Sequence, residues 1–292
     1  MDKKYRKMIE QAKLDAEEFA DNEMKPLYKE QKKSLTALEN MVGALFIKYA
    51  VDGLLKMNTQ QRTDTGIKET LKNVGKTLGG AEVKAVTDIL GKSYADTYYK
   101  NAFIMDSGIK IDLKFDILKK EFIDNAVNSK LARKMFSDRI WKNKADMIDQ
   151  LQASLNDAMV GKTTIDKIAR DIKNTYNVTA YESQRLVRTE NARVQSQAID
   201  DIGRSAGVKQ QMYSATLDML TNPVDASFDG NLYDIDDDSK PDIPQHPNCR
   251  CCYINVPYEG WAPTQRKDNE TKEIIDYKSY DTWLKDKNIS ED

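Results

Sequence analysis

His246-Pro-Asn-Cys-Arg-Cys-Cys252 is the stretch of this chain that constrains its fold most strongly. These seven consecutive positions hold the single histidine and all three cysteines of the 292 residues. Cysteine and histidine are the side chains best suited to ligate a soft metal or to act as a nucleophile, and paired cysteines form disulfides. A fold that gathers all of them in one segment has a specific arrangement to make there.

One interpretation of this heptapeptide is a zinc site. His246, Cys249, Cys251 and Cys252 offer up to four ligands, and a carboxylate oxygen of Asp225 or Asp218 can complete the set. The spacing departs from the usual structural sites, in which paired cysteines lie two to four residues apart and a second pair comes from elsewhere. A single residue separates the first two cysteines, and no Cys-x-x-Cys precedes them. Zinc therefore stays open as a cofactor.

Two other interpretations of the heptapeptide are also open. A Cys–His nucleophile needs a separated base and an oxyanion context, which the segment lacks. A structural turn needs neither. In that case Pro247 stiffens the loop, Asn248 bonds to the backbone, Arg250 pairs with an acidic side chain, and the thiols are buried.

A second constellation lies in a segment with helical spacing, Arg185-Leu-Val-Arg-Thr-Glu-Asn-Ala-Arg193. Glu190 and Arg193 are three residues apart, so they can pair on one face of a helix. This density of arginine and carboxylate suits either phosphate binding or a lock between the helix and a small domain. No nucleophile or cofactor motif stands beside it, which favours the lock.

Composition describes a highly charged protein with a net charge of −2, which argues against a globally basic nucleic-acid binder. Residues 218–292 contain 17 acidic and 8 basic side chains, a net of −9, whereas residues 1–217 contain 37 basic and 30 acidic ones, a net of +7. A basic helical body with an acidic tail suits one-sided contact with phosphate, or ordinary solvated helix faces. The apolar stretch 41–55 contains Lys48 and Asp52 and is too short to span a bilayer, and the first residues lack a secretory signal. We therefore expect the protein to be made in a cytosol and to stay there.

Periodicity predicts an α+β fold that is predominantly helical, with a helical amino-terminal half followed by a small mixed α/β carboxy-terminal domain. A seam with helical steps of three and four runs through Leu35, Leu38, Val42, Leu45 and Tyr49. Gly79-Gly80 predicts a joint between two short helices, and Thr179 predicts the cap of a separate helix at 180–203. After Gly207 we expect strands at 211–215 and 252–256 and a short amphipathic helix at 277–287.

Several motifs in this order resemble the phage head-morphogenesis family typified by the F protein of phage Mu, the minor head proteins of tailed bacteriophages. The resemblance covers about residues 130–257. Its motifs are Phe136-Ser-Asp-Arg-Ile-Trp-Lys-Asn143, Gly161-Lys-Thr-Thr164, Leu186-Val-Arg-Thr-Glu190, Asp218 followed by Asp229-Gly230, and His246-Pro-Asn-Cys-Arg-Cys251.

The chain departs from this family at one place. Many relatives carry Cys-x-x-Cys, or a cysteine or histidine, between the aspartate and the Asp-Gly pair. Here Asn222 and Asp225 occupy these positions. If those side chains bind metal in relatives, half of that site is missing from this chain, which favours a structural knot.

The resemblance implies three regions and a role in the virion. The regions are a helical segment at 1–130, a Mu F-like head-morphogenesis domain at 131–257, and an extension with a short helix at 258–292. The role is that of a non-enzymatic minor capsid component in the phage head, formed in the host cytoplasm. It would associate with the portal protein and with other capsid or scaffold proteins, possess no membrane partner, and contact packaged phage DNA nonspecifically. The residues assigned to the structural motif are Arg188, Thr189, Glu190, Arg193, Asp218, Asp229, Gly230, His246, Pro247, Asn248, Cys249, Arg250 and Cys251.

Two other functions stay open. One is a nonspecific DNA-binding accessory protein for packaging or ejection, which the basic excess of residues 1–217 allows. The other is an enzyme resembling an ADP-ribosyltransferase, with a centre at Arg188, Thr189 and Glu190. These three are consecutive on a helix and point in different directions, which argues against a shared centre.

Overall fold

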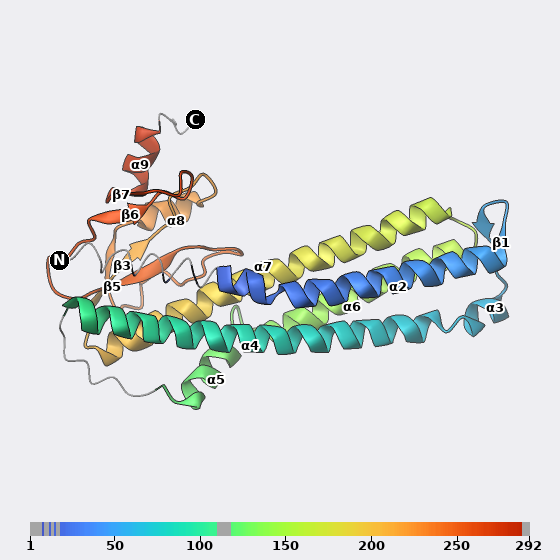
Figure 1. Cartoon of the computed structure of the whole chain (residues 1–292), viewed down its shortest axis with the longest axis horizontal. Coiled ribbons are helices and arrows are strands. Elements are labelled where there is room, and N and C mark those ends of the chain that lie inside the picture. The colour runs from blue at the N-terminus through green and yellow to red at the C-terminus, as the bar shows by residue number, and fades with distance from the viewer. Residues whose placement is uncertain (1–7, 9–11, 13–14, 16–17, 110–117, 288–292) are drawn as a thin grey trace. The chain divides into compact units, whose positions relative to one another are not determined.

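A computed structural model describes residues 8, 12, 15, 18–109 and 118–287 (Figure 1). Long helices dominate its amino-terminal part, and small sheets with short helices follow in its carboxy-terminal region. The prediction of a predominantly helical α+β fold is therefore confirmed. Among the helices of the described residues, no apolar segment reaches the length that a membrane crossing requires.

The chain forms two compact units. The bundle unit comprises residues 22–88 and 130–186, and the clasp unit comprises residues 1–21, 89–129 and 187–292. Each unit gathers segments that are distant in sequence. The regions expected at 1–130, 131–257 and 258–292 stay a prediction.

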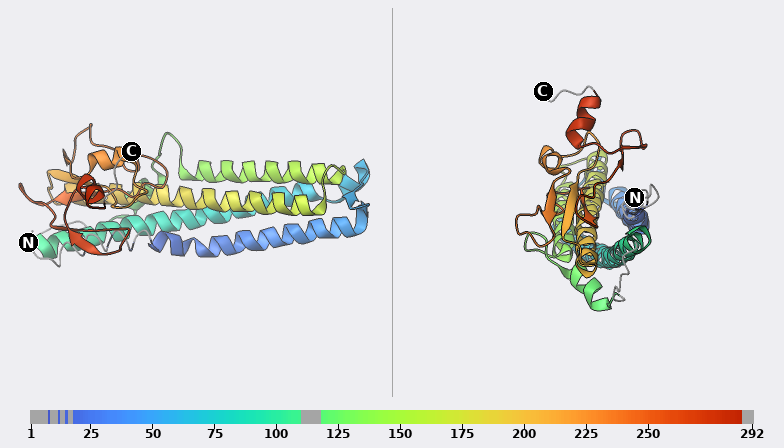
Figure 2. Two further views of the ribbon diagram at one scale, coloured as in Figure 1. Left: turned by 90° about the horizontal axis from the view of Figure 1, so that it is seen from above. Right: turned by 90° about the vertical axis from the view of Figure 1, so that its left-hand side faces the viewer.

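The bundle unit is built from helices that lie side by side (Figures 1 and 2). Its elements are α2 (Lys25–Tyr49), β1 (Ala50–Val51), β2 (Leu54–Leu55), α3 (Thr59–Asp64), α6 (Phe136–Met159) and the first parts of α4 (Ile67–Ile109) and α7 (Ile165–Ser205). The predicted seam lies on α2: Leu38 and Val42 are buried, and the other three members pack against the same core as partly buried side chains. That core continues through Leu71 and Leu78 of α4, Leu151 and Leu155 of α6, and Ile168 and Ile172 of α7.

Helix α4 runs unbroken through Gly79-Gly80, so the predicted joint there is wrong. Packing explains the difference. A Cβ atom on Gly79 would lie 2.3 Å from the Trp141 ring, which means that the missing side chain makes room for the indole of α6. Gly80 has open space around it and simply remains helical. A packing contact thus decides a position where local propensity suggests a break.

Helix α7 is also continuous, so the predicted cap at Thr179 is wrong. The Thr179 hydroxyl donates to the Thr175 carbonyl at 2.9 Å inside the helix, a bond that lets threonine remain in a helix interior. The helix begins instead after Thr164, whose hydroxyl accepts from the Lys167 N–H.

The clasp unit surrounds a three-stranded antiparallel sheet of order β4-β3-β5. Its elements are the later parts of α4 and α7, α5 (Lys120–Asn128), β3 (Gln210–Ser214), α8 (Pro223–Phe228), β4 (Leu232–Asp234), β5 (Cys252–Val256), β6 (Gln265–Lys267), β7 (Ile274–Asp276) and α9 (Tyr280–Asp286). The strands expected at 211–215 and 252–256 are β3 and β5, and the expected terminal helix is α9. Tyr213 pairs with Tyr253 across β3 and β5, and both are buried in a core that includes Cys249 and Cys251.

Helix α7 approaches this sheet closely at Gly203. A Cβ there would lie 2.6 Å from the Asn255 side chain of β5. Asn255 donates to the Ile199 carbonyl of α7 at 3.1 Å and accepts from Gln211 of β3 at 2.8 Å. Buried amides are therefore satisfied across the helix–sheet contact, which fixes how α7 lies on the sheet.

The last helix is anchored by the buried carboxylate of Asp268. It accepts from the Trp283 indole N–H at 2.8 Å and from the Glu270 backbone N–H at 2.9 Å, and the Lys287 ammonium lies 2.9 Å away. Burial alone would raise the pKa of Asp268, but these donors outweigh it and lower the pKa to about 2.

Candidate functional site

The heptapeptide that holds the histidine and cysteines forms a turn fastened to α7. The Cys249 N–H donates to the His246 carbonyl at 3.1 Å, and Asn248 has a left-handed backbone with φ 61°, a conformation that asparagine tolerates. The Asn248 N–H donates to the Thr189 hydroxyl at 3.0 Å. The predicted link between the closing motif and the Arg-Thr-Glu helix is thus a specific backbone-to-side-chain bond. We call residues 246–251 together with Thr189 the clasp.

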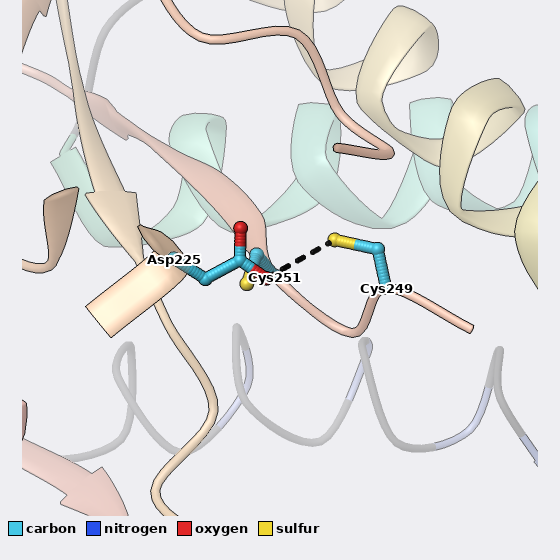
Figure 3. A group of neighbouring side chains, drawn as sticks. All are labelled: Asp225, Cys249 and Cys251. Atoms are coloured by element: carbon cyan, nitrogen blue, oxygen red, sulfur yellow. Dashed lines mark hydrogen bonds between the residues drawn. The ribbon is translucent and has the colours of Figure 1, made fainter. Parts of the chain in front are cut away.

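Asp225 lies beside Cys249 and Cys251, and its carboxylate is joined to Cys249 Sγ by a hydrogen bond (Figure 3). Helix α8 positions it: Asn222 caps the helix by accepting from the Val224 N–H at 2.9 Å, and Asp225 follows in the first turn. Its buried carboxylate accepts from the Tyr213 hydroxyl at Oδ1, at 2.9 Å. At Oδ2 it contacts His246 Nε2 at 2.7 Å and Cys249 Sγ at 3.8 Å.

The titratable groups around Asp225 shift in opposite directions. Burial opposes the charged form of His246, but the Pro247 carbonyl and the Asp225 carboxylate outweigh it and raise the pKa of the imidazole. A hydrogen bond from Cys251 lowers the pKa of Cys249 to about 6, against the opposing effect of burial. The same bond and burial raise the pKa of Cys251, because loss of its proton would place a second thiolate beside the first. The arrangement therefore favours one shared negative charge on the two sulfurs.

An ion pair stands on the other side of the cysteine segment. Arg250, between Cys249 and Cys251, binds the Asp218 carboxylate with both terminal nitrogens, and Nη2 donates to Oδ1 at 2.8 Å. The Arg250 carbonyl accepts from the Thr216 hydroxyl at 2.9 Å. Asp218 is thus committed to arginine and does not join the histidine and cysteines.

The Asp-Gly motif forms a second junction. Asp229 binds the Arg266 guanidinium of β6, with Nη1 donating to Oδ2 at 2.7 Å and Nη2 to Oδ1 at 3.2 Å. The same carboxylate accepts from the backbone N–H groups of Ala215 and Tyr280, at 2.9 Å and 2.8 Å. Gly230 follows with φ 82° and donates to the Tyr213 carbonyl at 2.9 Å. This motif joins the end of β3 to β6 and α9.

The Arg-Thr-Glu helix also makes the pair expected from its spacing. Arg193 Nε donates to Glu190 at 2.7 Å, with both side chains buried, and Arg193 Nη1 donates to the Ala126 carbonyl of α5 at 2.8 Å. Arg188 instead binds Asp21 with two donors, at 3.1 Å and 2.8 Å. The three consecutive residues Arg188, Thr189 and Glu190 therefore serve three separate contacts.

A groove of about 730 Å³ opens beside the clasp. Residues 246–251, residues 220–223 and one face of α7 line it. Its walls include the turn that carries the exposed Leu220.

The structure thus brings together Asp225, Cys249 and Cys251, each with one ligand atom within 4.8 Å of the others, and His246 is linked to them through its contact with Asp225 Oδ2. It leaves Cys252 outside this group, at the start of β5. Sequence reasoning missed Tyr213 and Arg266. Gln211, Met212 and Tyr213 are all buried in β3, so the alternation of the strand does not single out Tyr213, and nothing local to Arg266 indicates its partner.

Comparison with known proteins gives three results. Residues 149–254 match the family model described as Phage Mu protein F like protein. The chain is 23% identical over 282 residues to the minor head protein GP7 of Bacillus phage SPP1, a match that covers 88% of this chain and 90% of that protein. It is also 25% identical over 224 residues to the NAD(+)–arginine ADP-ribosyltransferase EFV of Enterococcus faecalis, covering 70% of this chain.

The two curated relatives differ in how much of them is matched. The chain spans 45% of the length of the ADP-ribosyltransferase, so more than half of that protein lies outside the match. No solved structure matches the chain.

Proposed function

We propose that this chain, which carries a Phage Mu F-like domain and is a distant homologue of a phage minor head protein, is a structural component of a tailed-phage head. In this role it associates with the portal protein or the inner shell while the head assembles. The observation that carries the proposal is the match to the SPP1 minor head protein along 88% of this chain and 90% of that protein. Similarity over nearly the whole of both chains favours a shared overall role more than a shared local motif does.

The clasp unit also supports a role in binding another protein. Met219, Leu220 and Val224 are exposed, and Leu220 is 80% accessible to solvent. Their turn is nevertheless held firmly: the Leu220 N–H donates to Asp218 at 3.0 Å, and the Met219 N–H donates to Glu270 at 2.9 Å. Exposed apolar side chains on an ordered turn are the kind of surface that a protein partner buries.

A binding experiment tests the association with the portal. Purified portal rings are sedimented with the wild-type chain, with Leu220→Asp and with Ile47→Asp. Ile47 is 90% exposed but belongs to the bundle unit, so it controls for adding a charge at an exposed apolar position. We expect the wild type and Ile47→Asp to sediment with the portal and Leu220→Asp to bind at least ten times more weakly. If the wild type stays in the supernatant with both portal rings and assembled shells, the association is refuted.

The enzymatic alternative has one observation in its favour, the match to an ADP-ribosyltransferase. The contacts of the three residues once considered for that centre weigh against it. Glu190 is fully buried against Arg193, and the Thr189 hydroxyl accepts from the Asn248 N–H. We expect the wild-type chain to consume no NAD in the presence of an arginine-containing acceptor. Turnover that Glu190→Gln abolishes would favour the enzyme.

Contact with DNA is a further part of the proposed role. The net charge of +7 over residues 1–217 favours nonspecific binding to phosphate. Such binding weakens steeply as salt rises, because each phosphate contact releases condensed counterions. A binding constant that is insensitive to salt, or no binding at 50 mM salt, would remove DNA from the proposal.

A further inference from the structure

We propose that Asp225, His246, Cys249 and Cys251 form a structural site for a zinc-class divalent cation. This site goes beyond the role in head assembly and does not depend on it. Four kinds of observation converge: the position of the ligand atoms, the orientation of the imidazole, the orientation of the carboxylate, and the backbone that presents the two sulfurs.

Three of the four proposed ligand atoms already lie close together. One carboxylate oxygen of Asp225 and the sulfurs of Cys249 and Cys251 all lie within 4.8 Å of one another, and all three residues are buried. Zinc binds oxygen at about 2.0–2.2 Å and sulfur at about 2.3 Å, so tetrahedral ligands stand roughly 3–4 Å apart. Rotations of these three side chains bring them to ligand spacing, and the His246 imidazole, which contacts Asp225 Oδ2 but lies outside this group, must turn toward the sulfurs to complete the set.

The imidazole presents the correct nitrogen. His246 Nδ1 lies 2.9 Å from the Pro247 carbonyl, which can only accept, so Nδ1 carries a proton and donates it. Nε2 is then the nitrogen available to a metal, and it faces Asp225 Oδ2 at 2.7 Å. Two lone pairs at this distance need a proton or a cation between them. An Nδ1–H bond to a backbone carbonyl is also the usual outer-shell support of a metal-bound histidine.

The carboxylate is oriented by a second outer-shell bond. The Tyr213 hydroxyl donates to Asp225 Oδ1 at 2.9 Å, which leaves Oδ2 to face the histidine and Cys249. Asp225 therefore offers a single oxygen toward the centre of the cluster. Metal ligands commonly have this support, and losing it weakens binding by about 10–100-fold.

The one-residue spacing of the cysteines fits the backbone that carries them. Residues 249–251 leave the turn and lead directly into β5. Alternate side chains of an extended segment share a side, so Cys249 and Cys251 both face Asp225 while Arg250 faces Asp218. The spacing that departs from a usual zinc knuckle thus places both sulfurs in one cluster, and Cys252 is excluded by the same alternation.

Without a cation the cluster has one self-consistent state, in which a protonated His246 pairs with Asp225 and the thiols share a hydrogen bond. The two states differ in a measurable way. The metal state displaces the proton shared by the two sulfurs and ligates both of them, whereas the metal-free state leaves both sulfurs without a metal bond.

The test uses the purified full-length chain, reduced and freed of metal with a chelator, and then titrated with Zn²⁺ or Co²⁺. We expect one equivalent of zinc to bind, and cobalt to show the near-ultraviolet charge-transfer absorbance of a metal–thiolate bond. Cys249→Ser and Cys251→Ser should lose this absorbance. Cys252→Ser is the matched control and should keep it, and Tyr213→Phe should raise the Kd about 10–100-fold while retaining its aromatic ring.

Two results would overturn the site. One is a wild-type chain that binds no more zinc than the Cys249→Ser/Cys251→Ser double variant, and the other is an equal loss in Cys252→Ser and Cys251→Ser. If the serine variants fail to fold, the wild-type cobalt spectrum decides alone: bound cobalt without thiolate absorbance, or no bound cobalt, refutes the site. Portal binding is measured separately, so failure of the metal site leaves the proposed head function standing.

Discussion

Replacing Asp229 by asparagine removes the negative charge that faces the buried guanidinium of Arg266. The two side chains are 1% and 7% exposed, and their N–O distances are 2.7 Å and 3.2 Å. Asparagine keeps the shape of the side chain but has only one acceptor oxygen. Its amide group must therefore face either the Ala215 N–H or the Tyr280 N–H, each of which now donates to the carboxylate.

The cost follows from what remains buried. Removing one partner of a buried ion pair typically costs about 3–5 kcal/mol, because the remaining charge is left uncompensated. The backbone donor that loses its acceptor adds about 1–3 kcal/mol where it cannot reach water. We expect Asp229→Asn to lower the free energy of unfolding by at least about 3 kcal/mol.

Equilibrium unfolding in urea, followed by circular dichroism and by tryptophan fluorescence, measures this cost. Asp276→Asn is the matched control, since Asp276 is exposed on the neighbouring strand β7, and we expect it to change stability by less than about 0.5 kcal/mol. The double variant Asp229→Leu/Arg266→Met should be less destabilised than the sum of its single changes, because no charge is left buried. If Asp229→Asn and Asp276→Asn unfold at the same urea concentration, the reasoning about this junction is refuted.

Three further predictions concern stability. The pKa of Asp268 falls from 3.8 to about 2 on folding, so its carboxylate contributes about 2 kcal/mol to the free energy of unfolding, which is present above the unfolded pKa and lost as pH falls through 2. In urea titrations, Asp268→Asn should lower the free energy of unfolding by roughly this amount at pH 7 and by about half as much at pH 3. A loss of stability that does not depend on pH would contradict the role given to this carboxylate. Thr189→Val removes the acceptor of the Asn248 N–H and should lower the free energy of unfolding by about 1–3 kcal/mol, whereas Thr189→Ser keeps the hydroxyl and should retain most of the wild-type stability. Equal losses in the two variants would show that the hydroxyl does not contribute to stability. Gly79→Ala forces a methyl group against the Trp141 ring and should destabilise the protein by about 1–3 kcal/mol, whereas Gly80→Ala places its methyl group in open space and should stabilise the protein by up to about 1 kcal/mol. Thermal unfolding that ranks the two variants the other way would contradict the packing described for α4.

The parts of the site that the sequence predicts are those set by local spacing. Glu190 and Arg193 pair because three residues separate them on a helix. A lock between this helix and the small domain was also expected, and the bond from the Asn248 N–H to the Thr189 hydroxyl supplies one. The convergence of Asp225 with the cysteines was expected only as one choice between two aspartates. The sequence alone could not decide which aspartate meets the cysteines. Asp218 and Asp225 lie on either side of the Asn222 helix cap, and it is the ion pair between Arg250 and Asp218 that leaves Asp225 to the cysteines.

What the sequence did not predict depends on contacts between distant residues. Arg266 stands 37 residues from Asp229, and no periodic pattern links them. Gly79-Gly80 and Thr179 carry local signals for helix ends, but packing against Trp141 and a bond to the preceding turn keep both helices continuous. Local propensity is a weak guide where tertiary contacts or a side-chain bond compensate for it.

Quantitative mass spectrometry of purified heads tests the proposed role most directly. Heads are isolated from a phage or induced prophage that encodes this chain, separated from soluble protein by sedimentation, and compared with heads made when the gene is deleted. We predict that the chain is present in heads at a molar amount far below that of the major shell protein, and that it remains after washing in high salt. Heads that assemble and package DNA while containing none of the chain would contradict the proposed function.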